Sequence, residues 1–91
     1  MNTTYTANIE AIRAEIIAQL GYDPKKPPAH VDDKEAAAAL YLKSTTLAVW
    51  RSTGRYNLPF LKVGRRVRYR VSDLAEFLAR RTANHTGEVR V

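Results

Sequence analysis

The chain has 91 residues and a mass of 10.3 kDa, enough for one small hydrophobic core and too little for two independent domains. It contains no cysteine, which excludes a disulfide framework, a thiolate zinc site and a cysteine nucleophile, and favours a cytoplasmic protein. The net charge of +6 comes entirely from the second half, because residues 1–50 hold five basic and six acidic side chains whereas residues 51–91 hold ten and three.

Apolar residues recur at helical spacing in an N-terminal segment, residues 1–22. They predict an amphipathic helix over about residues 8–20, which ends at Gly21. A linker with three prolines follows at residues 23–30 and separates this helix from the rest of the chain. The apolar stripe of the helix therefore needs a partner, either the downstream domain or another protein chain, and the sequence leaves both open. The residues of the stripe are Ile9, Ile12, Ile16, Ile17 and Leu20.

A capping box marks the start of a second helix. The Asp32 carboxylate can accept a hydrogen bond from the amide of Glu35, while the Glu35 side chain reaches back to the amide of Asp32. Residues 36–40 continue this helix, and their mostly small side chains allow another helix to approach closely.

A third helix is expected over residues 45–53, with Ser44 as its N-cap and Gly54 just past its end. Leu47 and Trp50 form its inward stripe, and short side chains occupy the opposite face. Two short helices joined by a turn of three or four residues form a helix-turn-helix, whose second helix enters the DNA major groove.

An alternating pattern predicts a β-hairpin over residues 60–71. Successive side chains of a strand point to opposite faces, so Val67 and Tyr69 face the core and the arginines between them share the other face. The positive charges of these arginines, together with that of Arg65 at the turn, would repel one another without an anionic partner. We therefore expect the hairpin to bind phosphate. The arginines of the row are Arg66, Arg68 and Arg70.

The last helix is expected to begin after Ser72, its N-cap. Acidic side chains near its start and Arg80 and Arg81 near its end match the helix dipole. Residues 82–91 show no pattern, and we expect them to form a flexible tail.

The order helix, turn, helix, arginine-rich hairpin and helix is accompanied by characteristic residues. Over residues 31–81 the chain resembles the small winged helix-turn-helix family of phage excisionases and AlpA-type regulators, which is related to the MerR DNA-binding domain. Tyr41 stands where that family commonly has Gly, and Ala48 and Val49 replace longer polar residues. The segments that carry the resemblance are Lys34-Glu35-Ala36-Ala37, Ser44-Thr45-Thr46-Leu47-Ala48, Trp50-Arg51-Ser52, Leu58-Pro59, Lys62-Val63-Gly64-Arg65-Arg66-Val67-Arg68-Tyr69 and Asp73-Leu74-Ala75-Glu76-Phe77-Leu78.

The resemblance implies an α+β, mostly helical fold: a winged helix-turn-helix with a two-stranded β-hairpin wing, to which the N-terminal amphipathic helix is an addition. It also implies that the helix over residues 45–53 is the recognition helix. The DNA contacts expected from this helix and its cap are Ser44, Thr45, Thr46, Ala48, Val49, Arg51 and Ser52. The DNA contacts expected from the wing are Lys62, Arg65, Arg66, Arg68 and Arg70.

Members of the resembled family are of two functional kinds. An excisionase, or recombination directionality factor, binds repeated sites near an attachment site, bends the DNA and assists excision by a tyrosine integrase. An AlpA-type regulator controls transcription. We favour the excisionase-like role, in a nucleoid-associated protein of a bacterium or phage. The implied partners are double-stranded DNA, other copies of the chain on adjacent sites and a tyrosine integrase.

Catalytic residues are not expected in this chain. His30 and His85 are too far apart to pair, helix capping accounts for the acidic cluster at residues 32–35, and no catalytic motif occurs. We therefore expect no enzymatic activity, metal, cofactor, small-molecule ligand or membrane span. The alternative from another class is a protein-interaction module whose basic half binds an acidic partner.

Overall fold

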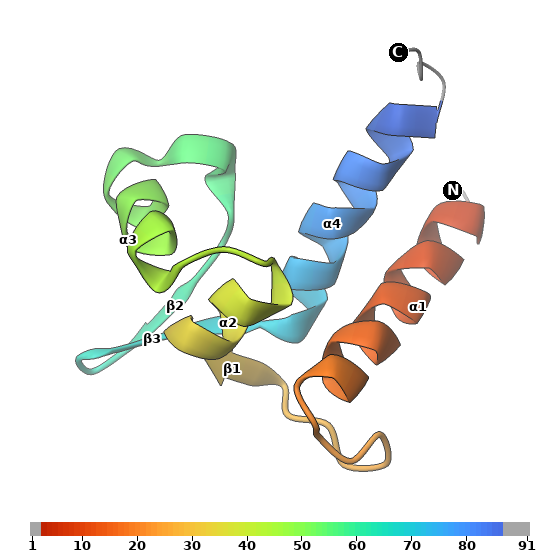
Figure 1. The fold of residues 1–91 in the computed structure, drawn as a ribbon, viewed down its shortest axis with the longest axis horizontal. Coiled ribbons are helices and arrows are strands. Elements are labelled where there is room, and N and C mark those ends of the chain that lie inside the picture. The colour runs from red at the N-terminus through yellow and green to blue at the C-terminus, as the bar shows by residue number, and fades with distance from the viewer. Residues whose placement is uncertain (1–2, 87–91) are drawn as a thin grey trace.

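The computed structural model describes residues 3–86, with side chains described for residues 8–81. Figure 1 shows α3 and the β2–β3 hairpin at one end of the molecule and α1 beside α4 at the other. This arrangement confirms the predicted α+β winged helix-turn-helix. No helix in the described part of the chain is long and apolar enough to cross a membrane. The elements are α1 (Thr3–Gln19), β1 (His30–Asp32), α2 (Asp33–Ala39), α3 (Ser44–Thr53), the 3₁₀ helix η1 (Arg55–Asn57), β2 (Leu61–Val63), β3 (Arg66–Arg70) and α4 (Val71–Thr86).

The wing belongs to a three-stranded antiparallel sheet with strand order β1-β3-β2. Strand β1 was not predicted, because three residues beside a proline-rich segment are too few to show an alternating pattern. It pairs with β3 in a register that places Val31 opposite Tyr69, and the amide of Val71 extends the pairing by donating to the carbonyl of Ala29 at 3.0 Å. Residues 29 and 30, which we expected in the linker, are therefore tied to the base of the wing.

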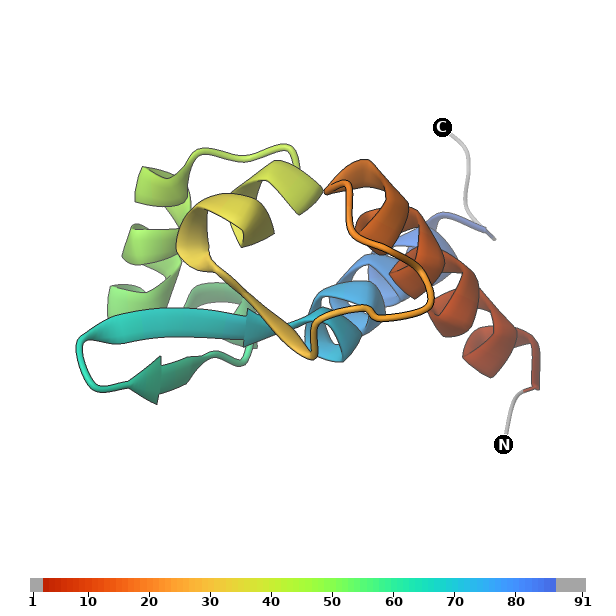
Figure 2. The same ribbon diagram turned by 90° about the horizontal axis from the view of Figure 1, so that it is seen from below.

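Helix α1 packs against α4 and shares the core of the domain (Figures 1 and 2). Ile16 and Ile17 are buried in the same cluster as residues of α2, α3, β1, β3 and α4. At the end of α1 the Gln19 amide donates to the Ala38 carbonyl at 3.2 Å, and the Tyr22 hydroxyl donates to Glu35. Of the two partners left open for the apolar stripe, the structure therefore selects the chain's own domain.

The capping box of α2 is present as predicted, with the Glu35 amide 2.8 Å from an Asp32 oxygen and the Asp32 amide 3.2 Å from a Glu35 oxygen. Other helix limits differ from the predictions. Helix α1 already begins at Thr3, and Lys43 rather than Ser44 is the N-cap of α3. Helix α4 begins one residue before Ser72 and continues to Thr86, so its last five residues fall within the expected tail. Residues 87–91 of that tail lie outside the described residues.

Helices α1 and α2 end in the same way, with a residue in the left-handed conformation. After α1 this residue is Gly21 at φ 82°, and after α2 it is Tyr41 at φ 59°. In α2 the Leu42 amide donates to the Ala37 carbonyl at 2.8 Å and the Tyr41 amide donates to the Ala38 carbonyl at 3.1 Å, the two hydrogen bonds of a Schellman motif. The turn thus keeps the conformation that glycine favours, although a tyrosine stands there.

A Tyr41→Gly variant should be more stable than the wild type by about 1 kcal/mol. A side chain with a Cβ is strained in the left-handed region, and the exposed ring, at 84% of its full accessibility, contributes little packing in return. Urea denaturation measures the gain. Tyr41→Ala is the control, since it removes the ring but keeps the Cβ, and equal stabilities of the Gly and Ala variants would contradict the explanation.

Candidate nucleic-acid interface

One face of α3 points away from the core and consists of short side chains. Leu47 is fully buried, whereas the side chain of Val49 is 54% exposed although it is aliphatic. Thr46 and Ser44 are half-buried, and the Ser52 hydroxyl donates to the Val49 carbonyl at 3.1 Å within the helix. We call this surface the α3 face, and its exposed residues are Thr45, Ala48, Val49 and Ser52.

The tip of the wing projects on the same side of the molecule as α3 (Figures 1 and 2). The turn between β2 and β3 consists of Gly64 and Arg65, and Gly64 adopts φ 63°, a conformation in which glycine carries no steric penalty. Arg65 and Arg66 are both exposed. Two guanidinium groups are therefore available at the end of the ribbon.

The arginine row alternates with the core residues as predicted, but its members have different surroundings. Arg66 and Arg70 are exposed, while Tyr69 between Arg68 and Arg70 is 1% exposed. Arg68 is half-buried, and it donates from Nε to Nδ1 of His30 at 3.0 Å and from Nη2 to the His30 carbonyl at 3.3 Å. His30 therefore holds Arg68 against β1.

The register of the hairpin separates Lys62 from the arginine row. Lys62 pairs with Val67, and paired residues of antiparallel strands point to the same face, so Lys62 lies on the face opposite Arg66 and Arg68. Lys62 is exposed. It is therefore available on the face of the wing that is turned towards the helices.

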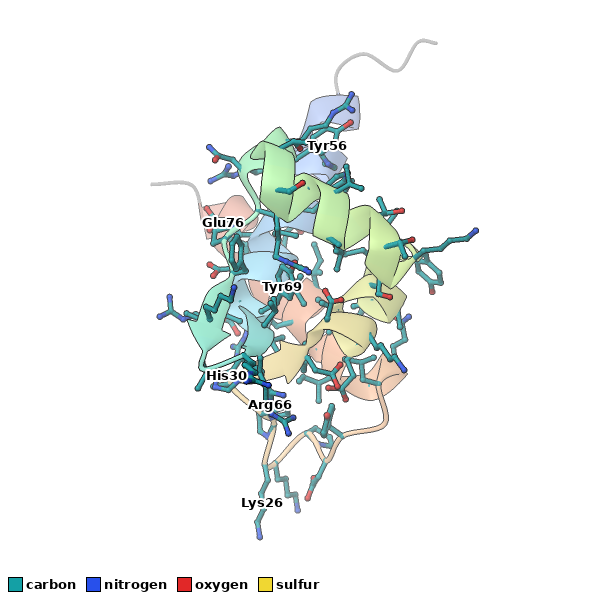
Figure 3. All side chains as sticks on the ribbon, turned by 90° about the vertical axis from the view of Figure 1, so that its left-hand side faces the viewer. Lys26, His30, Tyr56, Arg66, Tyr69 and Glu76 are labelled. Atoms are coloured by element: carbon teal, nitrogen blue, oxygen red, sulfur yellow. The ribbon has the colours of Figure 1, made fainter. Side chains whose placement is uncertain are left out.

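A hollow of about 390 Å³ lies between the wing and the starts of α2 and α3. Its lining contains both basic and acidic side chains, and the acidic ones come from the start of α2. The residues that line it are Asp32, Asp33, Lys34, Ser44, Arg66, Val67 and Arg68. The hollow separates the α3 face from the wing, so the two surfaces are distinct but lie side by side (Figure 3).

Comparison with known proteins agrees with this geometry. Residues 32–82, more than half of the chain, match the helix-turn-helix domain family. The chain belongs to that family. No curated protein and no solved structure matches it. The match begins at the N-cap of α2 and ends within α4, so the helix-turn-helix domain contains the α3 face and the wing but not α1. Family membership makes this a DNA-binding helix-turn-helix protein.

Arg51 of the helix-turn-helix domain has intramolecular partners that we did not expect. We predicted a DNA contact, but Nη1 of Arg51 lies 2.8 Å from an oxygen of Asp33 and 2.8 Å from the Tyr69 hydroxyl. Burial acts to lower the pKa of Arg51, but the hydrogen bonds to Tyr69 and Asp33 outweigh it and raise the pKa above its ordinary value. Burial raises the pKa of Tyr69 despite the opposing effect of Arg51. The guanidinium therefore stays charged and the phenol stays neutral at physiological pH.

Sequence reasoning missed His30, Asp33 and Tyr69 as polar partners near the interface. The pattern placed Tyr69 in the core, which is correct, but a period of two gives no information about where its hydroxyl points. Asp33 appeared only as part of the cap of α2.

In the part of the chain that the structure describes, no group of three or more His, Cys, Asp or Glu residues could hold a metal ion. The side chain of His85 lies outside the described residues.

Proposed function

We propose that this protein recognises specific sequences in double-stranded DNA, with α3 in the major groove and the wing tip over the adjacent minor groove. The observation that carries the proposal is the placement of the α3 face and the wing on one side of the molecule. Figure 3 views that side, with α3 above and the wing, marked by Arg66, below. A helix and a neighbouring basic ribbon that face the same way can contact one duplex together.

The α3 face suits base recognition by close contact. Val49 and Ala48 are exposed apolar groups that can touch the methyl groups of thymine, and the hydroxyl of Thr45 can bond to a base edge or a phosphate. Arg65 and Arg66 can enter a narrow minor groove, where A·T-rich sequence strengthens the negative potential. The wing therefore adds affinity and a preference for A·T-rich flanks.

Within this function we propose an excisionase-like role, in which several copies bind repeated sites and bend the DNA. A single domain of this size covers about 600–1,000 Å² of DNA-facing surface, so tight specific binding calls for more than one copy. A transcriptional regulator of the AlpA type is the alternative. Bending can be measured with circularly permuted duplexes, and excision can be assayed with and without the protein beside its integrase. Repression of a reporter gene with neither bending nor an effect on excision would favour the regulator.

The variant with both Arg65→Ala and Arg66→Ala should bind duplex DNA more weakly and lose its preference for A·T-rich flanks. The slope of log K against log salt is negative for phosphate binding. Each phosphate contact that is lost should make this slope shallower by about one unit, since fewer counterions are released. Fluorescence anisotropy over a range of salt concentrations, on duplexes with A·T-rich and with G·C-rich flanks, measures both effects. The wild type must first show a salt-dependent slope, and its absence would favour the protein-interaction module.

Arg70→Ala is the matched control for the wing. It removes one guanidinium where the double variant removes two, and Arg70 lies opposite His30 at the base of the wing, about 13 Å along the strand from Arg66. We predicted Arg70 as a backbone contact from the sequence, and the structure leads us to expect a smaller effect there than at the tip. If Arg70→Ala and the double variant reduced the slope equally per arginine and left the flank preference unchanged, the wing tip would not enter the groove.

A further inference from the structure

Arg51 joins three elements of the helix-turn-helix domain at one point. Its Nη1 atom contacts Asp33 at the start of α2 and the hydroxyl of Tyr69 in β3, each at 2.8 Å. Its guanidinium carbon also lies 6.0 Å from the centre of the Phe60 ring, just before β2. The side chain of Arg51 is only 20% exposed and that of Asp33 only 30%. These contacts lie beneath α3, on the side away from its exposed face.

This contact is a direct link between the recognition helix and the wing. Outside this region the backbones of α3 and β3 hardly approach one another, since α3 packs mainly on α2 and η1. Tyr69 is a residue of β3 and is 1% exposed (Figure 3), so the packing around its ring holds the hydroxyl in place relative to the strand. Hydrogen bonds from a charged guanidinium are shorter and stronger than those between neutral groups, so the bonds of Arg51 to the Tyr69 hydroxyl and the Asp33 carboxylate restrain the angle between α3 and β3.

We propose that Arg51 is a positioning residue that holds α3 and the wing at the angle at which both reach the same duplex. The inference rests on the proposed function, in which both surfaces contact DNA. Without this link, α3 and the wing must be fixed relative to one another when the protein binds DNA. The entropy lost in that step reduces the affinity, although every DNA-contacting side chain is still present. The sequence suggested a direct contact between Arg51 and DNA, and the two roles predict different results for its partners.

The test uses Tyr69→Phe and Asp33→Asn in the full chain. Neither substitution removes a positive charge, and Tyr69 is too deeply buried to touch DNA. The probe is a mixed-sequence duplex of about 20 base pairs, roughly two helical turns, together with a duplex of that length selected from a random pool by the wild type. Affinity and salt slope are measured at a temperature at which every variant is fully folded by circular dichroism. Loss of stability alone then changes neither quantity.

The matched control is Tyr22→Phe. The Tyr22 hydroxyl donates a hydrogen bond to the Glu35 carboxylate, and this bond joins the end of α1 to α2 without involving α3 or the wing. Like Tyr69→Phe, the substitution removes one partly buried tyrosine hydroxyl and its hydrogen bond, but it leaves the contacts between α3 and β3 unchanged. Its affinity and salt slope should equal those of the wild type.

If Arg51 positions the wing, Tyr69→Phe and Asp33→Asn should each weaken binding to the selected duplex by about tenfold, the effect of roughly 1.4 kcal/mol, and lower the salt slope. Tyr69→Phe should have no further effect in an Arg51→Met background, because both changes break the same link. If Arg51 instead contacts DNA directly, Tyr69→Phe leaves binding unchanged and Asp33→Asn, which removes a negative charge, tightens it. That result would overturn the inference while leaving the proposed function intact, whereas a wild type without salt-dependent duplex binding would contradict both.

Discussion

A Val49→Asp variant should lose sequence-specific DNA binding, with the affinity for the selected duplex reduced about 100-fold or more. Val49 lies at the centre of the α3 face, and a carboxylate there would face the bases and phosphates of the major groove without a cationic partner. The fold should not change, because Val49 is 54% exposed and contributes little to the packing of the core. Footprinting and anisotropy measure binding, and thermal unfolding measures stability.

The control for this prediction is Ala11→Asp. It adds the same negative charge at an exposed position of α1, which lies at the opposite end of the molecule from α3 (Figure 1). If Ala11→Asp weakened binding as much as Val49→Asp, the effect would come from net charge alone. A footprint of the Val49→Asp variant that matched the wild type would remove α3 from the DNA interface.

An Ile16→Ala variant should lose about 3 kcal/mol of its free energy of unfolding, a large part of the stability of a small domain. Ile16 is 2% exposed and belongs to the same cluster as Val31, Leu47, Tyr69 and Leu74, so its truncation leaves a cavity in the single core. Urea denaturation of the monomer measures the loss. Removal of residues 1–22 should unfold the domain for the same reason.

Glu15→Ala is the matched control, since Glu15 is the exposed neighbour of Ile16 in α1. It should change the free energy of unfolding by less than about 0.5 kcal/mol. The sequence left open a second possibility, in which the stripe of α1 joins two copies of the chain. In that case Ile16→Ala would leave the unfolding of the monomer unchanged and reduce only association on repeated sites, a result that would contradict the packing described here.

The elements that the sequence predicted well are those with a strong local cause. A capping box between Asp32 and Glu35 is complete within four residues, and glycines at positions 21 and 54 adopt the left-handed conformation expected at the ends of their helices. The alternation in β3 is equally local, because side chains of a strand must point to opposite faces. The fold class was implied by the resemblance to the winged helix-turn-helix family, which rests on these elements and on the residues within them. Residue type and spacing on the α3 face and at the wing tip added the expectation of DNA contacts.

The features that only the tertiary structure decided are contacts between residues far apart in the chain. Strand β1 exists because β3 pairs with it, and α1 belongs to the core because α4 offers it an apolar surface. Arg51 has the same local pattern as a residue that reaches out to DNA, yet Asp33 and Tyr69, each 18 residues away, hold it beneath α3. A local sequence pattern predicts which face of its element a side chain occupies. The residues that the side chain contacts on that face depend on how the elements pack together.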